Sequence, residues 1–383
     1  MNATRPDRAN VKVSVAMITY NHEAFIAQAI DSVLMQQTDF EVELVIGEDC
    51  SPDGTRSIVR DYAEKHPGII KALLHPQNLG PAHGPGKNNL VSVLRACRGQ
   101  YIALLEGDDY WTDPLKLQKQ VDFLETHPEC AICFHDVMVT YMDQQRTSHY
   151  FCLPDQKEIS TLKDLLINNF IPTCSVIYRR GLFGEIPNWF HELPIGDWPL
   201  HVLNAQYGHI GYLDEGMAVF RIHAGGIWSS RDTVARIKQW LPMYGPLYGH
   251  LGEAHGTAIR SGASKTIAAG AAAIFEADET NSLASSLEFV RTALVAAAGA
   301  GYANRSFVRV TKARSYEALG FTAYRRRDMR IARYCYARAL AFDPALARNK
   351  GILSLWFEAC IGERASAMRK SITSRLLRDR SLL

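Results

Sequence analysis

Residues 101–109 read YIALLEGDD, and this stretch decides the class of fold. Its first part, 101–105, is a short apolar run of the kind that makes a strand buried on both faces. The run ends in Glu106-Gly107-Asp108-Asp109, which places three carboxylates within four residues. In mostly parallel sheets, ligands bind at the carboxyl ends of the strands. The stretch therefore predicts a buried strand with a polar site at its end.

The same arrangement repeats upstream of residue 101. Apolar runs typical of strands alternate with segments whose apolar residues recur at helical spacing. The expected strands are 11–17, 41–46 and 69–75, and the expected helices are 23–37, 55–65 and 88–97. This alternation predicts an α/β fold with a mostly parallel sheet and helices on both faces.

The pattern changes downstream of the acidic cluster. A helix is expected at 114–125 and another at 198–207, and strands are expected near 131–140, 173–178 and 211–222. From about Asp232 the chain is helical and Ala-rich, with breaks expected near Gly262 and at 299–301. We therefore expect a polar N-terminal arm (1–10), an α/β domain (11–231), an α-helical region (232–363) and a basic C-terminal helix (364–383).

Composition is that of an ordinary globular protein. The chain has 383 residues, of which 47% are hydrophobic, and a net charge of +2, so we expect neither extensive disorder nor a nucleic-acid partner. Cys130 and Cys133 form a CxxC pair without the second pair that a zinc site needs, which favours a structural role. Scattered thiols and a polar N-terminus without a signal-like apolar stretch lead us to expect a cytoplasmic protein.

The acidic cluster is the first candidate for chemistry. Glu106, Asp108 and Asp109 repel one another unless a cation or hydrogen bonds offset their charge. A divalent ion held by one or two carboxylates together with substrate phosphates is the usual solution. The alternative is that these carboxylates cap the helix expected at 114–125. Asp113-Pro114 already supplies that cap. We therefore favour a site for a metal ion and a diphosphate.

Three motifs in order then identify a family resemblance. Residues 13–21 read VSVAMITYN, 48–55 read EDCSPDGT and 106–111 read EGDDYW. Together they resemble the family 2 inverting glycosyltransferases of the GT-A fold, over roughly residues 11–230. The resemblance implies transfer of a sugar from a nucleotide-sugar, with Mn²⁺ or Mg²⁺ as cofactor.

The resemblance also implies which residues bind the donor. Thr19, Tyr20 and Asn21 match the nucleotide pocket, and Asp49 matches the aspartate that recognises the base, which would be uracil. The remaining matches depart from the family pattern: Glu48 and Glu106 replace aspartates, and Lys87 stands where an arginine often closes the pocket. Asp108 belongs to the donor site, and Asp109 is our expected direct metal ligand.

Two later residues complete the implied chemistry. In Gly196-Asp197-Trp198, Asp197 matches the catalytic base that accepts the proton of the acceptor hydroxyl. It fits nearly as well as the N-cap of the helix expected at 198–207. In residues 221–226, RIHAGG, His223 matches a ligand of the metal or the diphosphate. A lone histidine is otherwise more often a core residue.

Other catalytic centres find little support in the sequence. His22, His83, His135 and Asp136 lack the spacing of a nucleophile and its base, and no phosphate-binding loop follows the first strand. The aromatic residues Tyr110, Trp111, Trp189, Phe190 and Trp198 fit either sugar stacking or the core.

The helical region contains one segment with the spacing of a tetratricopeptide repeat. Its small and aromatic positions are Tyr316, Leu319, Gly320, Ala332, Tyr336, Ala339 and Pro344. A single repeat cannot bury its own face, so neighbouring helices should pack against it. Such a region could also bind a protein partner.

The end of the chain, 364–383, has basic residues around an apolar stripe at helical spacing. Two arrangements fit this pattern: a helix lying on an anionic membrane, or a solvated helix packed on the protein. The first would suit a lipid-linked acceptor.

The functional expectation combines these observations. We expect an inverting glycosyltransferase that moves a sugar, from a UDP-sugar, to a hydroxyl of a glycan or lipid-linked glycan in bacterial surface polysaccharide biosynthesis. A nucleotidyltransferase and a non-catalytic scaffold with a protein-binding helical region are the alternatives.

Overall fold

The computed structural model describes residues 11–80, 86–143, 146–226, 231–278 and 283–360. The chain divides into two compact units, Met1–Arg231 and Asp232–Leu383. The polar arm at 1–10 and the basic segment at 364–383 lie outside the described residues.

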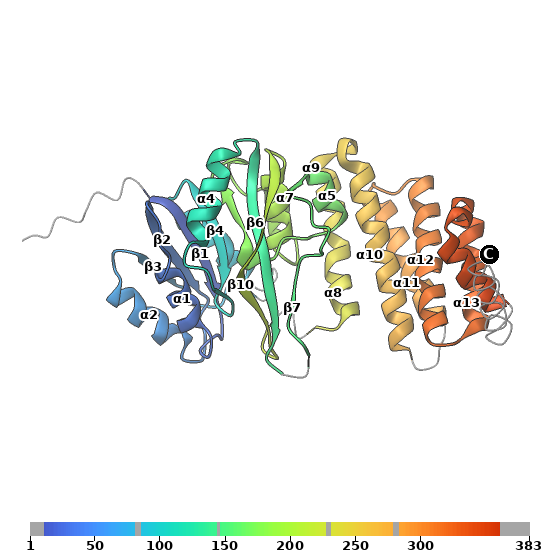
Figure 1. The fold of residues 1–383 in the computed structure, drawn as a ribbon, viewed down its shortest axis with the longest axis horizontal. Coiled ribbons are helices and arrows are strands. Elements are labelled where there is room, and N and C mark those ends of the chain that lie inside the picture. The colour runs from blue at the N-terminus through green and yellow to red at the C-terminus, as the bar shows by residue number, and fades with distance from the viewer. Residues whose placement is uncertain (1–10, 81–85, 144–145, 227–230, 279–282, 361–383) are drawn as a thin grey trace, which may run out of the picture. The chain divides into compact units, whose positions relative to one another are not determined.

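A ten-stranded sheet forms the framework of the first unit (Figure 1). Its strands run in the order β3-β2-β1-β4-β9-β6-β10-β5, while β7 pairs with β6 and β8 pairs with β10. The bounds are β1 Val11–Thr19, β2 Glu41–Glu48, β3 Ile70–Leu74, β4 Tyr101–Glu106, β5 Tyr110–Trp111, β6 Cys130–Tyr141, β7 His149–Tyr150, β8 Ile159–Ser160, β9 Ile177–Arg179 and β10 His209–Ile222.

The long strands pair parallel and the short ones antiparallel. β3, β2, β1 and β4 form one parallel set, and β6 and β10 form another. β9 joins the two sets by pairing antiparallel with both β4 and β6. This arrangement confirms the predicted α/β class with a mostly parallel sheet.

The first seven helices of the chain belong to this unit. They are α1 Ile26–Leu34, α2 Thr55–Lys65, α3 Lys87–Ala96, α4 Lys116–Thr126, α5 Leu162–Ile167, α6 Asn188–His191 and α7 Asp197–Ala205. Alternate residues of β1 (Val13, Val15 and Met17) share one core with buried residues of α1, α2 and α4. α3 packs on the opposite face of the sheet, where Gly47 of β2 lies against the Asn89 and Val93 side chains of α3. Helices therefore cover both faces, as the alternating pattern predicted.

Turns shorten two of the expected elements of the first unit. The strand expected at 173–178 begins only at Ile177, because Thr173–Ser175 forms a 3-10 turn in which the Ser175 N–H and hydroxyl both donate to the Pro172 carbonyl. The helix expected from residue 114 starts at Lys116. Asp113 instead closes a tight turn, accepting at its Oδ1 from the Leu115 N–H at 2.8 Å.

The second unit is built from helices (Figure 1). They are α8 Thr233–Trp240, α9 Tyr244–Leu251, α10 Gly256–Ala277, α11 Leu283–Gly299, α12 Arg305–Arg325 and α13 Met329–Phe342, with a further helical stretch at 350–360. The break expected near Gly262 was wrong, since α10 runs through it. Gly262 is buried beside Ile259 and Ala263 on a helix that packs closely against α12, where a small residue is favourable. The break at 299–301 is present.

α12 and α13 form a closely packed pair over the segment with repeat-like spacing. Tyr316, Leu319, Gly320, Ala332, Tyr336 and Ala339 are all buried. A Cβ at Gly320 would lie 3.0 Å from the Tyr336 ring, so a glycine is what lets this ring lie flat against α12. The assignment to the tetratricopeptide class stays a prediction.

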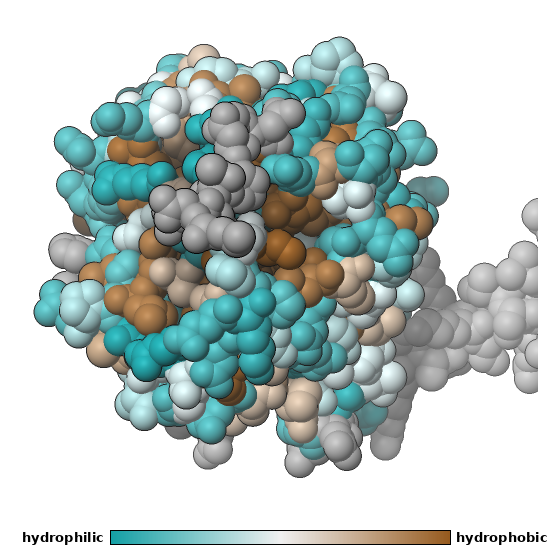
Figure 2. Space-filling view, turned by 90° about the vertical axis from the view of Figure 1, so that its left-hand side faces the viewer, coloured by the Kyte–Doolittle hydropathy of each residue, from teal (hydrophilic) through white to brown (hydrophobic). Residues whose placement is uncertain are grey.

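The surface seen from the left-hand side of Figure 1 is mixed in polarity. Figure 2 shows hydrophilic residues over most of this face, with apolar residues in hollows nearer its middle. Within the described residues, no helix has the length and apolar character needed to cross a bilayer.

Candidate functional site

The ends of three parallel strands bring the predicted donor-site residues to one edge of the sheet. In the register of β1 with its neighbours, Thr19 lies beside Glu48 of β2, and Ile18 lies beside Glu106 of β4. The loops that follow β1, β2 and β4 therefore start side by side. The motifs read from separate stretches of sequence meet here.

Hydrogen bonds hold the first two loops together. The Asn21 N–H donates to the Ser51 hydroxyl at 3.0 Å, and the His22 N–H donates to the Thr55 hydroxyl at 2.8 Å. Asn21 and Cys50 both have positive φ, 57° and 60°, a backbone region that non-glycine residues rarely adopt. Strained residues of this kind cluster at functional sites because the surrounding contacts hold them there.

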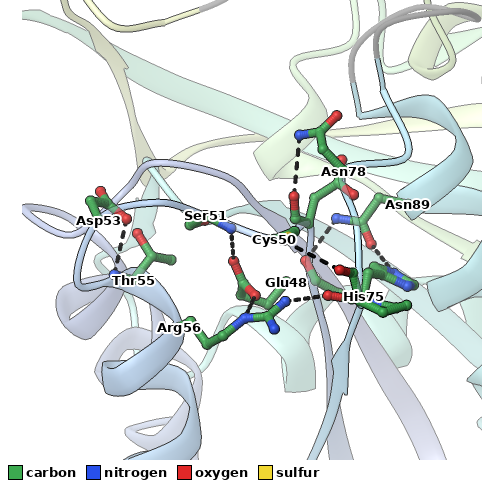
Figure 3. Close-up of polar contacts among 12 residues, drawn as sticks. Glu48, Cys50, Ser51, Asp53, Thr55, Arg56, His75, Asn78 and Asn89 are labelled. Atoms are coloured by element: carbon green, nitrogen blue, oxygen red, sulfur yellow. Dashed lines mark hydrogen bonds and ion pairs between the residues drawn. The ribbon is translucent and has the colours of Figure 1, made fainter.

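Glu48 is buried and committed to contacts within the protein. Its Oε1 accepts from the Ser51 N–H at 2.6 Å, and its Oε2 accepts from Arg56 Nε at 2.5 Å. Figure 3 shows the carboxylate lying between these two groups, with Arg56 reaching on to the His75 carbonyl. Glu48 therefore shapes the loop after β2.

Asp49 lies one residue further and is also buried. Its Oδ1 accepts from the Leu79 N–H at 2.8 Å, and the Asn78 amide donates to its main-chain carbonyl at 3.1 Å. The loop after β3 is thus joined to the loop after β2 (Figure 3). Burial raises the pKa of Asp49, and the Leu79 hydrogen bond partly offsets that rise.

Asp108 faces two histidines. Its Oδ2 lies 3.1 Å from His223 Nε2, which follows β10, and 3.6 Å from His22 Nε2, which follows β1. The His223 ring also packs against Phe25, with centroids 4.6 Å apart. The acidic motif and His223 are therefore in direct contact, and the role of His223 as a ligand of the metal or the diphosphate stays a prediction.

Asp109 is turned toward the interior. Its Oδ1 accepts from the Arg221 main-chain N–H at 2.8 Å, and its side chain also bonds to Cys174. Arg221 in turn donates through Nη1 to the Asp108 carbonyl at 2.6 Å and lies over the Tyr110 ring at 4.3 Å. Arg221 thus supports the acidic loop from β10.

The electrostatics of the cluster reflect its crowding. Burial, followed by the charges of Asp109, Asp108 and Asp197, raises the pKa of Glu106 well above its usual value. Burial and the charge of Asp108 raise the pKa of Asp109. Burial alone would raise the pKa of Asp108 as well, but His22 and His223 outweigh it and lower the pKa. Asp108 is therefore the carboxyl of the cluster that most readily carries charge.

Asp197 joins this cluster from a distant stretch of chain. It is the first residue of α7, and Gly196 occupies the N-cap position, so Asp197 does not serve as the cap. The Thr173 side chain bonds to both Glu106 and Asp197 and connects the two carboxyls. Burial raises the pKa of Asp197.

Lys87 is committed to contacts within the protein, and its expected place at the nucleotide pocket stays a prediction. Its buried Nζ donates to the main-chain carbonyls of His191 and Leu193, just before α7. Burial lowers its pKa to about 8. Lys87 therefore supports the segment that leads to Asp197.

The contacts also reveal residues that sequence reasoning left without a role. His22, Thr173 and Arg221 each touch the acidic cluster. His22 directly follows the Thr-Tyr-Asn motif, and this position could have identified it as a site residue. No local sequence pattern identifies Thr173. His135 is buried elsewhere, with Nδ1 against its neighbour's carbonyl at 2.7 Å, so the hydrolytic alternative built on it is not assembled. His83 lies outside the described residues.

Two cysteines and two tryptophans that the sequence left open between roles belong to the core. Cys130 and Cys133 are buried free thiols, and burial raises their pKa values to about 11 and about 12. Trp111 and Trp198 are also buried, and each indole N–H donates to a main-chain carbonyl.

Comparison with known proteins identifies the family. The family model of glycosyl transferase family 2 matches residues 14–186. TuaG of Bacillus subtilis, described as a glycosyltransferase of teichuronic acid biosynthesis, is 30% identical over 230 residues, which are 60% of this chain and 85% of TuaG. The chain belongs to glycosyltransferase family 2.

Two further comparisons show how much of the chain is similar to known proteins. An uncharacterized protein of Mycobacterium tuberculosis is 45% identical over 229 residues, covering 60% of this family 2 chain but only 63% of the relative. The crystal structure of S. aureus TarS residues 1–349 with UDP-GlcNAc matches 91% of this chain and 90% of that one, with a TM-score of 0.51 and 19% identity. That likeness supports the GT-A fold.

Proposed function

We propose that this family 2 protein is an inverting glycosyltransferase that transfers a sugar from a nucleotide-sugar to a hydroxyl group. The observation that carries the proposal is the convergence of carboxyl groups from distant parts of the chain. Glu106 ends β4 with Asp108 and Asp109 just after it, Asp197 begins α7, and His223 follows β10. A cluster of this kind suits the neutralisation of a departing diphosphate and the removal of one proton.

Asp108 and His223 are the residues that fit a divalent metal. Their 3.1 Å separation is that of neighbouring ligands of an octahedral ion with bonds of about 2.1 Å. Within the described residues no group of three or more acidic, histidine or cysteine side chains is arranged to hold a metal. A site that is completed by the donor's phosphates, as is usual for Mg²⁺, would need few protein ligands. Bound there, Mn²⁺ or Mg²⁺ would act as a Lewis acid on the leaving diphosphate.

Asp109 takes a supporting role in this proposal, in place of the direct ligand role expected from its motif. Its Oδ1 already accepts from the Arg221 N–H, and its pKa is raised by burial. Holding Arg221 fixes the acidic loop against β10 and so positions Asp108.

Asp197 is the proposed general base. A base must accept the proton of the acceptor hydroxyl as that oxygen attacks the anomeric carbon, and a raised pKa makes a carboxylate a better acceptor. The Thr173 side chain orients Asp197 relative to Glu106. Inversion follows from a single displacement without a covalent sugar–protein intermediate.

The donor nucleotide is proposed to lie between the loops after β1, β2 and β3. Asp49 would accept the imide N–H of uracil, with Thr19, Tyr20 and Asn21 lining the pocket. UDP-GlcNAc, which is present in the TarS crystals, is a sensible first donor to test. TuaG's part in teichuronic acid biosynthesis supports a bacterial surface polysaccharide as the product class. A cytoplasmic location and a lipid-linked acceptor fit this role.

A donor-hydrolysis assay with a panel of nucleotide-sugars and Mn²⁺ tests the proposed function. We expect slow hydrolysis of at least one UDP-sugar and its loss on chelation. Absence of both turnover and nucleotide binding with every donor would favour the scaffold, whereas release of pyrophosphate from a nucleoside triphosphate would favour the nucleotidyltransferase.

A matched pair of variants tests the metal assignment. Asp108→Asn should abolish Mn²⁺-dependent UDP binding, measured by calorimetry. Asp109→Asn should lower the free energy of unfolding by more than it lowers the free energy of this binding. The reverse pattern would return the metal to Asp109.

A further inference from the structure

The second unit contains a groove that the proposed reaction does not use. Two cavities of about 570 and 410 Å³ lie among α11, α12 and α13. They share Ala298, Val308, Lys312 and Phe342 and so form one continuous depression, which we call the α11 groove. The three helices lie near one another in Figure 1.

The walls of the α11 groove come from single faces of helices. α11 contributes Leu287, Leu294, Val295 and Ala298, which recur at helical spacing. α12 contributes Val308, Lys312 and Tyr316 at the same spacing. From Leu287 to Ala298 the groove extends about 16 Å along α11, or about three helical turns.

The floor of the groove is apolar and open to solvent. Val295 is 62% exposed, although it is a large aliphatic residue on a helix with other buried positions. The rings of Tyr316 and Phe342 stack with centroids 5.8 Å apart and add to the apolar lining. An exposed apolar strip between helices is the usual receptor for the apolar face of another helix.

The rim of the groove is cationic. Arg305, Arg309, Lys312 and Arg338 line it, and Lys312 and Arg338 lie over the Phe342 ring at 5.5 and 5.2 Å. Among the described residues that line the groove none is acidic. The rim therefore favours an occupant that carries negative charge beside its apolar groups.

We propose that the α11 groove binds an amphipathic helix of a partner protein that has apolar residues on one face and acidic residues flanking them. The chain's own segment at 364–383 is a poor match, because its charged residues are almost all basic and the rim would repel them. The length of the groove suits a helix of about three turns. This surface lies in the helical unit and does not depend on the proposed transferase reaction.

Binding of a synthetic peptide to the full-length chain tests the proposal. The probe is a fluorescein-labelled peptide of about three turns with leucines at i, i+4 and i+7 and glutamates beside them. We expect saturable binding by fluorescence anisotropy, weakened by added salt. Failure to saturate would overturn the proposal.

Matched variants locate the binding surface. Val295→Glu should weaken binding at least about tenfold, because it places a carboxylate on the apolar floor. Ala296→Glu, an exposed change one residue along α11 and outside the groove lining, should leave binding unchanged. Equal effects of the two variants would contradict the assignment. Circular dichroism and thermal unfolding check that both variants are folded.

A charge exchange tests the acidic character of the partner. The double variant Arg309→Glu, Lys312→Glu should no longer bind the glutamate peptide. It should instead bind a peptide of the same sequence with lysines in place of the glutamates. Equal binding of the two peptides by the wild-type chain would overturn the proposed preference for an acidic partner. The wild-type chain could instead bind anionic phosphatidylglycerol vesicles and not the peptide. If Val295→Glu removed that vesicle binding, the groove would be a lipid site and the proposal would be wrong.

Discussion

At the scale of single residues, the candidate site is a problem of buried charge. Glu106, Asp108, Asp109 and Asp197 gather where burial raises the pKa of three of them. His22, His223 and Arg221 contact Asp108 in this cluster. Carboxyls placed this close stabilise a bound cation more than they stabilise the fold, since their mutual repulsion is relieved only when positive charge enters.

The role of Asp197 gives the first prediction. In Asp197→Asn we expect turnover to fall at least about a hundredfold, the usual scale for a lost general base, with UDP binding unchanged. Only the ionised carboxylate accepts a proton, so activity should fall as pH decreases through the raised pKa, above the ordinary aspartate value of 3.8. Rates of sugar transfer from about pH 4 to pH 8 measure this limb. Near-normal turnover of the variant would reduce Asp197 to a structural residue.

Lys116 gives a prediction about stability. It is fully buried, lies over the Trp111 ring at 3.8 Å, and has no hydrogen-bond partner for Nζ within the described residues. Burial lowers its pKa to about 7, so the folded state disfavours its charge. We expect Lys116→Met to stabilise the protein by about 1–2 kcal/mol near neutral pH, the desolvation cost less the cation–π attraction.

The pH dependence of that gain follows from linkage. Between pH 7 and the ordinary lysine value of 10.5, the unfolded chain holds a proton that the folded protein does not, so the wild type gains stability as pH rises. The difference in melting temperature between variant and wild type should therefore be largest at about pH 6 and shrink by about pH 9. A difference that does not vary with pH would show that Lys116 is not the group responsible.

At the scale of elements, short loops between regular structure carry the proposed chemistry. The acidic loop after β4 is fixed by the strand end on one side and by Arg221 of β10 on the other. The loops after β1 and β2 are fixed by each other. Elements distant in sequence thus hold the site in place, which is the usual way in which a rigid scaffold positions functional loops.

The α12–α13 pair gives an element-scale prediction. A Cβ at Gly320 would meet the buried Tyr336 ring at 3.0 Å, so Gly320→Val should destabilise the helical unit by about 1–3 kcal/mol through overpacking. Gly299→Val is the matched control, because a Cβ there meets nothing within 4 Å. Thermal unfolding followed by circular dichroism compares the two. Equal melting temperatures would show that the interface relaxes freely around the added side chain.

At the scale of the whole molecule, the two units have separate cores. The first unit buries alternate faces of its strands under helices, and the second buries helix against helix. Each unit therefore contains the apolar burial that cooperative folding needs. The proposed donor site lies wholly in the first unit.

This separation predicts how ligand affects unfolding. UDP with Mn²⁺ at about 100 times its Kd should stabilise the first unit by about 2.7 kcal/mol and leave the second unchanged. Scanning calorimetry should then show one transition moving and one staying in place. Gly320→Val should move only the transition that UDP leaves in place. A single transition that both changes move together would mean that the units unfold as one.

By itself the amino-acid sequence determined the alternation of strands and helices between residues 11 and 125, the family and the residues at the strand ends. Those features depend on local periodicity and on motifs of a few residues. The tertiary structure decided how side chains are directed: Asp109 inward to Arg221, Asp108 toward His22 and His223, and Lys87 onto the carbonyls before α7. The reason is that a side chain's partners here come from segments tens to more than a hundred residues away, and only packing brings those segments together.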